Sequence, residues 1–416
     1  MSSVKKILVV SQHFWPESFR INDICDFLID KSCDVDVLCG IPNYPKGYFF
    51  KGYSYINKRR ESHNGVNIVR SLEIPRGKNT NPRIIANYLS FPFFSLLQVP
   101  RLLMRHYDKI FIYQTSPVMM SIAGIIIGKI KRTETTMYVL DLWPENLFSV
   151  LDIKNPFLRR VATTVSHWHY RNVDKLIVLS EKMKTKLLEI TQKDPDKIII
   201  LPQACEKIYE TKMHDKKLAS RFKSGFNVVY TGNISPAQSF ETVIEAAKIL
   251  KISGVADINW IIVGDGMSRK WLEKEVKESG LEDSFFFEGY KPIEDIPKYT
   301  DIADVLIGCL VKSDLLEATI PAKVISYLAA GKPIVLAMDG EVRELVNHVR
   351  CGFAGPSGDT NRLVINIRAV YSLSNSERKQ MGDRGQKYHF HNLERNLIFN
   401  KLYEFLFVKK EGVLGK

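Results

Sequence analysis

Along its 416 residues the chain alternates between two kinds of apolar pattern. Short runs rich in Val and Ile, typical of buried strands, are followed by longer stretches with the three-to-four-residue spacing of amphipathic helices. Ile7–Val10 with Ile21–Asp30 is the first such pair, and Val228–Tyr230 with Pro236–Leu250 opens a second series. This alternation predicts an α/β fold of doubly wound parallel sheets with helices on both faces.

The predicted elements form two series, separated by the polar, lysine-rich stretch Pro202–Gly225. The sequence therefore predicts a domain over residues 1–205, a second over 206–391, and a C-terminal helix within 392–416 that packs back toward the first domain. Doubly wound domains bind ligands at the carboxyl ends of their strands, so we expect a cleft between the two. The other predicted strands are Val35–Cys39, Lys109–Tyr113, Met137–Leu140, Leu176–Leu179, Ile198–Leu201, Trp260–Val263, Phe285–Phe287, Val305–Ile307 and Ile334–Leu336. The other predicted helices are Met119–Lys129, Glu181–Ile190, Met267–Glu278 and Val324–Ala330.

The net charge of +13 is concentrated in the first half of the chain. Residues 1–205 carry 29 Lys and Arg against 18 Asp and Glu, whereas the remaining residues carry 30 against 28. We therefore expect the first half to face an anionic partner. A membrane surface, a phosphorylated substrate and nucleic acid are the candidates.

The signals for compartment favour the cytoplasm. The apolar run Ile7–Val10 is too short for a signal peptide. Ile84–Pro100 and Ile110–Gly128 are free of charge but interrupted by proline, so neither offers the ~20 continuous apolar residues of a spanning helix. The six cysteines form no CxxC and no metal-ligand spacing, which predicts buried thiols in a reducing compartment.

The second half contains a turn suited to a phosphate, where strand Val228–Tyr230 runs into Thr231-Gly-Asn-Ile-Ser-Pro236. Gly232 permits an unusual backbone angle, Ser235 suits a helix N-cap, and Pro236 suits the first helical position. Free amides at a helix N-terminus bind phosphate, although any α/β unit needs a turn of this kind.

A second helix start adds a cation. Pro321 fits the first turn of helix Val324–Ala330, and the Lys323 ammonium is placed to reach a phosphate held by the same amides. Two helix N-termini at adjacent strand ends, with one lysine between them, predict a pyrophosphate site. The sequence contains no GxxxxGK[ST], which excludes a P-loop nucleotidase.

Two Trp-Pro-Glu triplets follow strands in the first half and end at Glu17 and Glu145. Each places a carboxylate on a proline-stiffened loop at a strand's carboxyl end, where it is available for acid–base chemistry on a hydroxyl group. His13 and Asp141 lie on the same two loops and are further candidates. The alternatives are a rigid packed loop for each triplet, an N-cap for Asp141 and a structural role for His13.

A basic and aromatic stretch, Lys46–Arg105, holds 11 Lys and Arg against two acidic residues, together with nine Tyr and Phe. Lys58, Arg59 and Arg60 are consecutive within it. This mixture favours contact with an anionic bilayer. A solvated basic face is the second interpretation, and stacking on single-stranded nucleic acid is the third.

Two His-x-His pairs raise the question of a metal ion. His167 with His169 and His389 with His391 lack carboxylate or thiol partners at ligand spacing, so we expect packing or capping roles. No acidic pair follows a strand in a way that would hold a divalent ion on a diphosphate. The sequence predicts no metal and no other cofactor.

These motifs resemble the family 4 glycosyltransferases of GT-B fold, and within them the WbuB branch of bacterial O-antigen and capsule enzymes, often assigned as L-fucosamine transferases. The resemblance covers about residues 4–400. In the second half it rests on Val229-Tyr-Thr-Gly-Asn233, Ile262-Val-Gly-Asp-Gly266, Phe287-Glu-Gly-Tyr290, Pro321-Ala-Lys323 and Tyr327-Leu-Ala-Ala-Gly-Lys-Pro333. In the first half it rests on Ser11-Gln-His-Phe-Trp-Pro-Glu17, Arg20-Ile-Asn-Asp23, Pro42-Asn-Tyr-Pro45 and Asp141-Leu-Trp-Pro-Glu145.

The resemblance implies roles for individual residues, with departures from the wider family. Where that family holds the donor diphosphate with an arginine and a lysine, this chain has the neutral Asn233 and Gln238. Ser326 replaces the glutamate that grips the ribose, and Glu317 lies one residue from the position of its partner glutamate. The implied donor-binding residues are Gly232, Asn233, Gln238, Gly289, Glu317, Pro321, Lys323 and Ser326. The implied catalytic residues are His13, Glu17, Asp141 and Glu145. Acceptor or membrane contacts are expected from Arg20, Asn43, Tyr44, Lys58, Arg59 and Arg60.

The function implied by the resemblance is a retaining sugar transfer between two Rossmann-like domains. N-acetyl-L-fucosamine would pass from UDP to a saccharide on a polyprenyl diphosphate, at the cytoplasmic face of the cell membrane, in O-antigen or capsule biosynthesis. The alternatives are a nucleotide-sugar epimerase of the same fold and a nucleotide-sugar-binding module that has lost catalysis.

Overall fold

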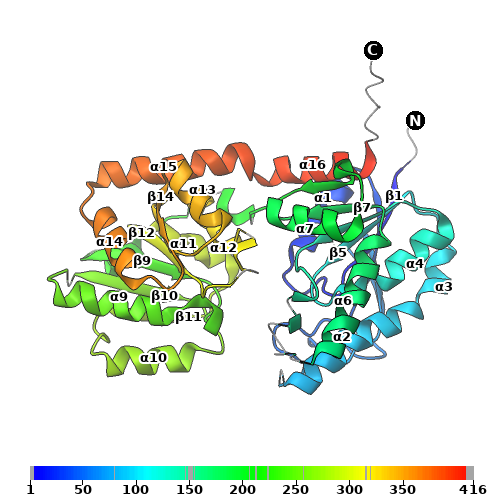
Figure 1. The fold of residues 1–416 in the computed structure, drawn as a ribbon, viewed down its shortest axis with the longest axis horizontal. Helices are drawn as coiled ribbons and strands as arrows, with labels where there is room; N and C mark the ends of the chain where they lie inside the picture. Colours follow the sequence, from blue (N-terminus) through cyan, green and yellow to red (C-terminus); the bar gives the residue numbers. More distant parts are fainter. Residues whose placement is uncertain are drawn as a thin grey trace, which may run out of the picture. The chain divides into compact units, whose positions relative to one another are not determined.

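The computed structural model divides the chain into two compact units (Figure 1). Unit 1 comprises Met1–Pro202 and Phe399–Lys416, and unit 2 comprises Gln203–Ile398. The structure describes residues 4–78, 80–145, 147–148, 153, 155–205, 207–210, 213–222, 224–255, 257–313, 316–318 and 320–408.

Unit 1 is built on an eight-stranded sheet of order β3-β4-β2-β1-β5-β6-β7-β8. All neighbouring strands are parallel except β3 and β4, which are antiparallel. The apolar runs found in the sequence form its centre, since β1, β5 and β6 are almost fully buried. The strands are β1 (Lys6–Val10), β2 (Asp34–Cys39), β3 (Arg60–His63), β4 (Val66–Arg70), β5 (Lys109–Gln114), β6 (Thr135–Val139), β7 (Lys175–Val178) and β8 (Ile198–Ile200).

Seven described α-helices accompany this sheet, and the last of them begins at the end of unit 2. It packs on unit 1 through Phe399, whose ring centroid lies 5.4 Å from that of Phe27, and through Tyr403, whose hydroxyl accepts a 3.0 Å hydrogen bond from Lys5 Nζ. The helices are α1 (Arg20–Asp30), α2 (Asn81–Leu96), α3 (Val99–Leu103), α4 (Ile122–Lys131), α6 (Pro156–Arg171), α7 (Glu181–Thr191) and α16 (Arg395–Phe407), with 3-10 turns η1 (Val118–Ser121) and η2 (Pro195–Lys197).

The segment between β2 and β5 differs most from the sequence prediction, which placed no element there. β3 is polar (Arg-Glu-Ser-His) and pairs only with β4 at the sheet edge, so it lacks the apolar run of a buried strand. Helices α2 and α3 have no acidic residue and expose apolar side chains, so they lack an amphipathic pattern. The basic and aromatic stretch is therefore a hairpin followed by two helices, and not one uniform surface.

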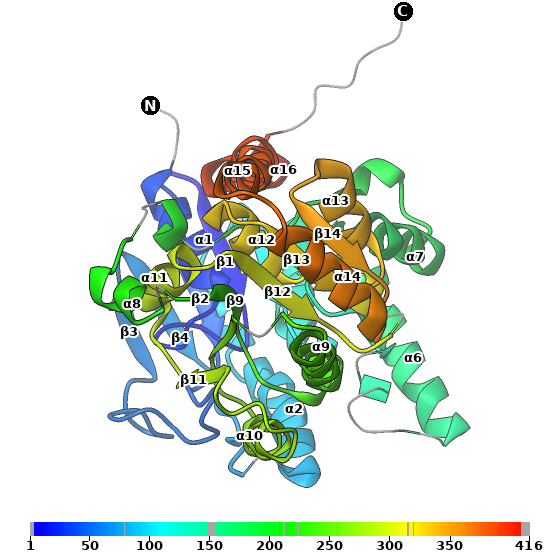
Figure 2. The ribbon, with the colours of Figure 1, turned by 90° about the vertical axis from the view of Figure 1, so that its left-hand side faces the viewer.

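Unit 2 contains a six-stranded, fully parallel sheet of order β11-β10-β9-β12-β13-β14. Alternate residues of β9 enter two different cores. Val228 and Tyr230 pack with α9 and α14, whereas Val229 packs with α11, α12 and α13. Figure 2 shows α9 and α12 on opposite sides of these strands. The strands are β9 (Phe226–Thr231), β10 (Ile258–Val263), β11 (Phe285–Gly289), β12 (Val305–Cys309), β13 (Ile334–Ala337) and β14 (Gly352–Gly355).

The helices of unit 2 include five that the sequence analysis did not predict, namely α8, α11, α13, α14 and α15. α15 is a separate 18-residue helix with few apolar residues and two glycines, and it ends at Asn392, three residues before α16 begins. The stretch predicted as a linker contains η3 and α8. The helices are α8 (Lys216–Arg221), α9 (Phe240–Ile252), α10 (Arg269–Glu278), α11 (Ile296–Asp301), α12 (Ala322–Ala330), α13 (Glu341–Val349), α14 (Thr360–Tyr371) and α15 (Asn375–Asn392), with 3-10 turns η3 (Lys207–Glu210), η4 (Pro236–Gln238), η5 (Ile293–Asp295) and η6 (Leu316–Ala318).

Each sheet has a point where the strand order reverses. In unit 1 the chain leaves β1 for β2 on one side and later places β5 on the other. In unit 2 β10 and β12 flank β9 in the same way. Parallel α/β sheets bind ligands outside the carboxyl ends of such neighbouring strands. The loops after β1, β5, β9 and β12 are therefore where functional groups are expected.

The cysteines fit the sequence prediction. All six are buried and none forms a disulfide. Burial raises the pKa of the thiols of Cys25, Cys33, Cys39, Cys309 and Cys351, and at Cys351 the pKa reaches about 11. In the part of the chain that the structure describes, no helix is both long and apolar enough to cross a bilayer.

Candidate functional site

Two glycine turns in unit 2 meet backbone to backbone. β9 ends at Thr231, and Gly232 follows with φ +138°, in the region that favours glycine. Gly264 follows β10 with φ +146°, and a Cβ on it would lie 1.8 Å from the carbonyl oxygen of Gly232. Only glycine fits at position 264 without moving one of the two turns.

We expect Gly264→Ala to lower the free energy of unfolding by several kcal/mol, because left-handed backbone strain of about 1–3 kcal/mol is combined with an overlap of similar cost. Gly254→Ala is the matched control, since Gly254 has φ +84° but open space around its Cβ position. Thermal or denaturant unfolding of the two variants measures the difference. Equal losses would mean that the two turns separate at little cost.

Lys323 is the cation beside these turns. It lies in the first turn of α12, and its Nζ donates hydrogen bonds to the Tyr230 hydroxyl, at 2.7 Å, and to Gln238 Oε1. Its Nζ is also the atom nearest to a Cβ built on Gly232, at 3.4 Å. We call Tyr230, Gly232, Gln238 and Lys323 the Lys323 site.

The electrostatics of the Lys323 site favour an anion. Burial lowers the pKa of Lys323 to about 7. A paired carboxylate would oppose this effect, but none among the described residues forms an ion pair with the Lys323 ammonium group. The N-terminus of α12, which follows Pro321, adds the positive end of a helix dipole next to it. A phosphate placed here would supply the missing countercharge and accept hydrogen bonds from the first-turn amides of α12. The predicted contribution of the Gly232 turn is not available in this form, because the amides of Gly232 and Ile234 already donate to the carbonyls of Val263 and Asp265, both at 2.9 Å.

The other predicted donor residues occupy varied positions. The Asn233 carbonyl accepts a 2.6 Å hydrogen bond from the Tyr230 hydroxyl, so Asn233 borders the Lys323 site. Gly289 ends β11, and its carbonyl accepts from the Gly264 amide at 2.9 Å. Ser326 is buried on α12, where its hydroxyl donates to the Ala322 carbonyl at 3.3 Å. Glu317 lies in η6, and its backbone packs against Gly340.

Two residues of this region were missed by sequence reasoning. Tyr230 links Lys323 to the turn after β9, and its place as the last but one residue of a strand before a glycine turn was the available signal. Arg269 begins α10, and its guanidinium lies 3.2 Å from a Cβ built on Gly289. It pairs with Asp265 at 3.5 Å and with Glu273 at 2.8 Å, so its charge is already balanced.

In unit 1 the loop after β1 holds a buried His13–Glu17 pair. His13 Nδ1 lies 2.9 Å from Glu17 Oε2, and both side chains are almost fully buried. Glu17 Oε1 accepts hydrogen bonds from the backbone amides of Asn43, at 2.7 Å, and Tyr44, at 2.6 Å. A carboxylate in this setting accepts a hydrogen bond from Nδ1–H, and the tautomer that carries its proton on Nδ1 has its lone pair on Nε2. His13 stacks on Phe19 at a 4.7 Å centroid distance, which fixes the ring.

A second buried carboxyl, Glu73, supports this pair. It follows β4 and accepts hydrogen bonds from Gln12 Nε2, at 3.2 Å, and from Asn43 Nδ2. Burial, followed by the negative charge of Glu17, holds the pKa of Glu73 well above its usual range. The side-chain oxygens of Gln12 and Asn43 are buried and have no hydrogen-bond partner among the described residues.

Asp141 and Glu145, on the loop after β6, point to different neighbours. Asp141 Oδ2 accepts a 2.8 Å hydrogen bond from Ser116, which itself accepts one from the Trp143 indole at 2.9 Å. Glu145 forms an ion pair with Lys186 of α7. Burial raises the pKa of Tyr170, and the charges of Glu145 and then Asp141 add to this rise, so both carboxylates lie near its hydroxyl.

The predicted acceptor and membrane residues separate into structural and exposed groups. Arg20 pairs with Asp23 at 3.1 Å, and Asn43 and Tyr44 hold Glu17 as described. Arg59 donates from Nε and Nη2 to the Arg70 carbonyl, at 2.9 and 2.7 Å, so its guanidinium joins two strands. Lys58 lies over the Tyr53 ring at 4.7 Å, and Arg60 is exposed at the start of β3.

The histidine pairs have packing roles where the structure shows their contacts. His169 Nδ1 lies 2.7 Å from the Ser121 hydroxyl, and burial lowers the His169 pKa to about 4. His391 Nδ1 contacts the Lys387 carbonyl at 2.7 Å. Over the described ranges, no three or more His, Cys, Asp or Glu side chains gather in a way that could hold a metal ion.

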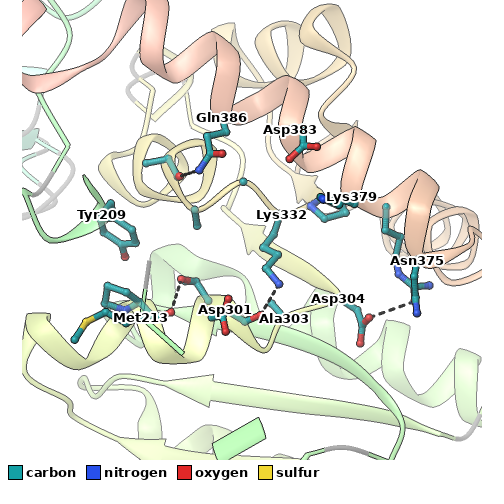
Figure 3. A pocket seen from close by; sticks show the side chains of 17 residues that line it. Tyr209, Met213, Asp301, Ala303, Asp304, Lys332, Asn375, Lys379, Asp383 and Gln386 are labelled. Carbon is teal, nitrogen blue, oxygen red and sulfur yellow. Dashed lines mark hydrogen bonds and ion pairs between the residues drawn. The ribbon is translucent and has the colours of Figure 1, made fainter. Parts of the chain in front are cut away.

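A polar cavity of about 420 Å³ lies elsewhere in unit 2, between α11, the end of α12 and α15 (Figure 3). Lys332 extends into it and donates to the Asp301 carbonyl, and Asp304 pairs with Arg378 at 3.3 Å on its wall. Asp304 and Pro333 directly precede β12 and β13, so this cavity lies at the amino edge of the sheet. The Lys323 site lies at the carboxyl edge, and the two are therefore separate.

Comparison with known protein families gives a match within unit 2. A model of the family described as glycosyl transferases group 1 matches residues 214–388, which include every residue of the Lys323 site. The match covers less than half of the chain. The matched segment lies entirely within unit 2, so the glycosyltransferase relationship is centred on the Lys323 site.

Curated relatives are similar to this chain at modest identity. The amylovoran biosynthesis glycosyltransferase AmsK of Erwinia amylovora is 28% identical over 184 residues, which are 42% of this chain and 45% of AmsK. WcaI of Escherichia coli K12, assigned to colanic acid biosynthesis, is 24% identical over 352 residues, which are 80% of this chain and 83% of WcaI. The matches to the first relatives span about half of their length.

Similar solved structures extend over both units. HepE of Anabaena, solved with UDP, has a TM-score of 0.71 at 16% identity, and the match covers 96% of this chain and 98% of HepE. This similarity confirms the predicted GT-B fold of two parallel-sheet α/β domains. The curated relatives that match this chain are named glycosyltransferases, and the solved structures share its fold.

Proposed function

We propose that the chain transfers a sugar from a uridine diphosphate donor bound to unit 2 onto an acceptor bound to unit 1. The observation that carries the donor half is the Lys323 site. A buried ammonium with uncharged partners, a helix N-terminus and two glycine turns together suit a diphosphate. HepE has been solved with UDP and with UDP-glucose, which supports a uridine nucleotide as the carrier of the donor sugar.

The acceptor half rests on the His13–Glu17 pair. A neutral imidazole with its lone pair on Nε2 can accept a hydrogen bond or a proton from a sugar hydroxyl. Glu17 fixes the tautomer, and Glu73 accepts a hydrogen bond from the Asn43 side chain and so holds Asn43 against Glu17. On the donor side, Lys323 and the α12 N-terminus would stabilise the leaving diphosphate. We propose no metal and no other cofactor for the reaction.

The proposed acceptor is a saccharide on a polyprenyl diphosphate at the cytoplasmic face of the cell membrane. The names of the relatives, which refer to amylovoran and colanic acid, support a role in bacterial polysaccharide biosynthesis. Retention of configuration, an O-antigen or capsule product and N-acetyl-L-fucosamine as the sugar follow from the resemblance to the WbuB branch. Screening radiolabelled nucleotide sugars against membrane extracts tests the sugar and the acceptor together.

A simpler assay separates the proposal from its alternatives. An enzyme that activates a UDP-sugar releases UDP slowly in the absence of acceptor, whereas a binding module that has lost catalysis releases none. An epimerase of the same fold would convert the donor sugar without any lipid. Purified protein, UDP-sugars and separation of the products by chromatography are sufficient for this test.

We expect UDP binding to take up nearly one proton at pH 8 and much less at pH 6. The pKa of Lys323 is about 7, so the free side chain is mostly neutral at pH 8 and mostly charged at pH 6. A bound diphosphate favours the charged form and raises this pKa. Calorimetry in buffers of different ionisation enthalpy measures the uptake, and Lys323→Met should abolish it. Equal uptake at the two pH values would contradict this role.

A further inference from the structure

Helix α2, whose place in unit 1 is seen in Figure 1, exposes apolar side chains, and so do Leu97 at its end and Met104 at the end of α3. We call these residues the α2 stripe. Their spacing of four residues along α2 places them on one face of the helix. Such a contiguous apolar surface on a folded domain marks an interaction site. Its members, with their exposed fractions, are Ile85 (41%), Leu89 (54%), Phe93 (64%), Leu97 (63%) and Met104 (80%).

The opposite face of α2 is already occupied, so the stripe cannot turn inward. Asn87, Phe91 and Ser95 are fully buried, and α2 packs on η1 and α4. The side chain of Asn87 donates to the Ile74 carbonyl at 2.8 Å, and Ser90 accepts from the Ile74 amide at 2.9 Å. These contacts fix the rotation of the helix.

The charged residues of the sequence segment that contains the stripe are all positive. No Asp or Glu occurs between Glu73 and Asp108. Lys78, Arg83 and Arg101 are exposed near the two ends of α2 and form no ion pair with another described residue. An apolar helix face with cations at both ends fits the boundary between lipid headgroups and acyl chains.

Helix α6 also combines exposed apolar side chains with neighbouring cations. It packs on η1, as α2 does, and exposes Phe157 (70%) and Leu158 (52%) beside Arg159 and Arg160. A second copy of the chain is a poor partner for this face, because two such basic surfaces would repel one another.

We propose that the α2 stripe inserts into the headgroup region of an anionic lipid bilayer, while the cations at its ends contact lipid phosphates. α2 has 16 residues and is about 24 Å long, which suits a helix lying in the plane of the interface. This inference rests on the proposed lipid-linked acceptor and names the surface that contacts the lipid.

The same helix reaches the proposed acceptor site. Asn87 Oδ1, on the inner face of α2, accepts hydrogen bonds from Gln12 Nε2 and Arg76 Nε, both at 3.2 Å. Gln12 also donates to Glu73, which supports the His13–Glu17 pair. The lipid surface and the acceptor-binding loop therefore contact opposite faces of one helix, about 10 Å apart. A saccharide on a lipid held at the stripe would emerge close to His13.

The test compares full-length Leu89→Ser/Phe93→Ser/Leu97→Ser with wild type by co-sedimentation on vesicles of equal parts phosphatidylglycerol and phosphatidylcholine. We expect wild type to bind these vesicles, with a part of the binding that persists at high salt, and the variant to lose about tenfold or more in affinity. Ile249→Ser/Ile252→Ser is the matched control, since it removes exposed apolar groups from α9 of unit 2 and should bind as wild type.

Several readouts keep the outcome interpretable. Lys78→Gln/Arg83→Gln/Arg101→Gln should lose the salt-sensitive part of vesicle binding, which gives a second variant that leaves the apolar face intact. UDP affinity should be unchanged in all variants, and this separates the surface from the proposed donor chemistry. Unchanged vesicle binding by both variants would overturn the proposal. So would a dimer in sedimentation velocity that the stripe substitutions dissociate, since the face would then join two copies of the chain.

Discussion

Replacing Lys323 by methionine is expected to weaken UDP binding by about one to two orders of magnitude. A charge-assisted hydrogen bond to phosphate contributes roughly 1.5–3 kcal/mol, and each 1.4 kcal/mol corresponds to about tenfold in affinity. The fold should not suffer, because the ammonium is buried without a countercharge and methionine fills a similar space. Titration calorimetry with UDP measures the loss directly.

The matched control is Lys379→Met, which removes the same charge from an exposed position on α15 of unit 2. This variant should bind UDP as tightly as the wild type. Were both variants to lose affinity equally, net charge rather than a specific contact would hold the diphosphate. Undiminished binding in Lys323→Met would move the donor site elsewhere.

Glu17→Gln is expected to lower the rate of transfer by about 10²–10⁴-fold while UDP affinity stays close to that of the wild type. The glutamine oxygen can still accept from the amides of Asn43 and Tyr44, so the loop should keep its form. Its amide nitrogen would instead donate to His13 Nδ1 and drive the proton to Nε2. His13 Nε2 would then be a hydrogen-bond donor, whereas the reaction needs an acceptor at this atom. The same change of tautomer lowers the rate strongly in other enzymes with a catalytic histidine.

Single-turnover transfer to a soluble acceptor measures this loss. Glu145→Gln is the comparison, because Glu145 is partly exposed and paired with Lys186. We expect a smaller loss of transfer rate there. His13→Ala combined with Glu17→Gln should be no worse than His13→Ala alone, since both remove the same function. An additive double variant would show that Glu17 acts independently of His13.

The features of the site that could be predicted from the sequence are those that depend on residues close together along the chain. The turn at Gly232, the start of α12 at Pro321 and the position of Lys323 follow from local backbone preferences and from the alternation of strands and helices. The pairing of Lys323 with Tyr230 joins residues 93 positions apart, and the contact between Asn43 and Glu73 spans 30 positions. Neither follows from spacing along the chain, because each depends on how the strands are ordered in the sheet.

Other features were hidden because their residues obey no simple pattern. Arg59 looked like a surface cation in a basic triplet, yet its guanidinium joins the ends of β3 and β4. Helix α2 was not predicted, since its apolar residues cover both its buried and its exposed faces. Helix α15 has the reverse composition, with so few apolar residues that periodicity could not reveal it. At each of these places the usual rule, by which apolar residues are buried and charged residues face solvent, does not describe the element.

The division of unit 1 between the two ends of the chain has a consequence for biosynthesis. Phe399, Leu402 and Leu406 of α16 are buried, yet they leave the ribosome after the whole of unit 2. Unit 2 is continuous in sequence and can fold as soon as it emerges, because domains generally fold as units during synthesis. Unit 1, although it is made first, must wait for the last helix. During translation its sheet is therefore the part of the nascent chain that remains incomplete for longest and depends most on protection from aggregation.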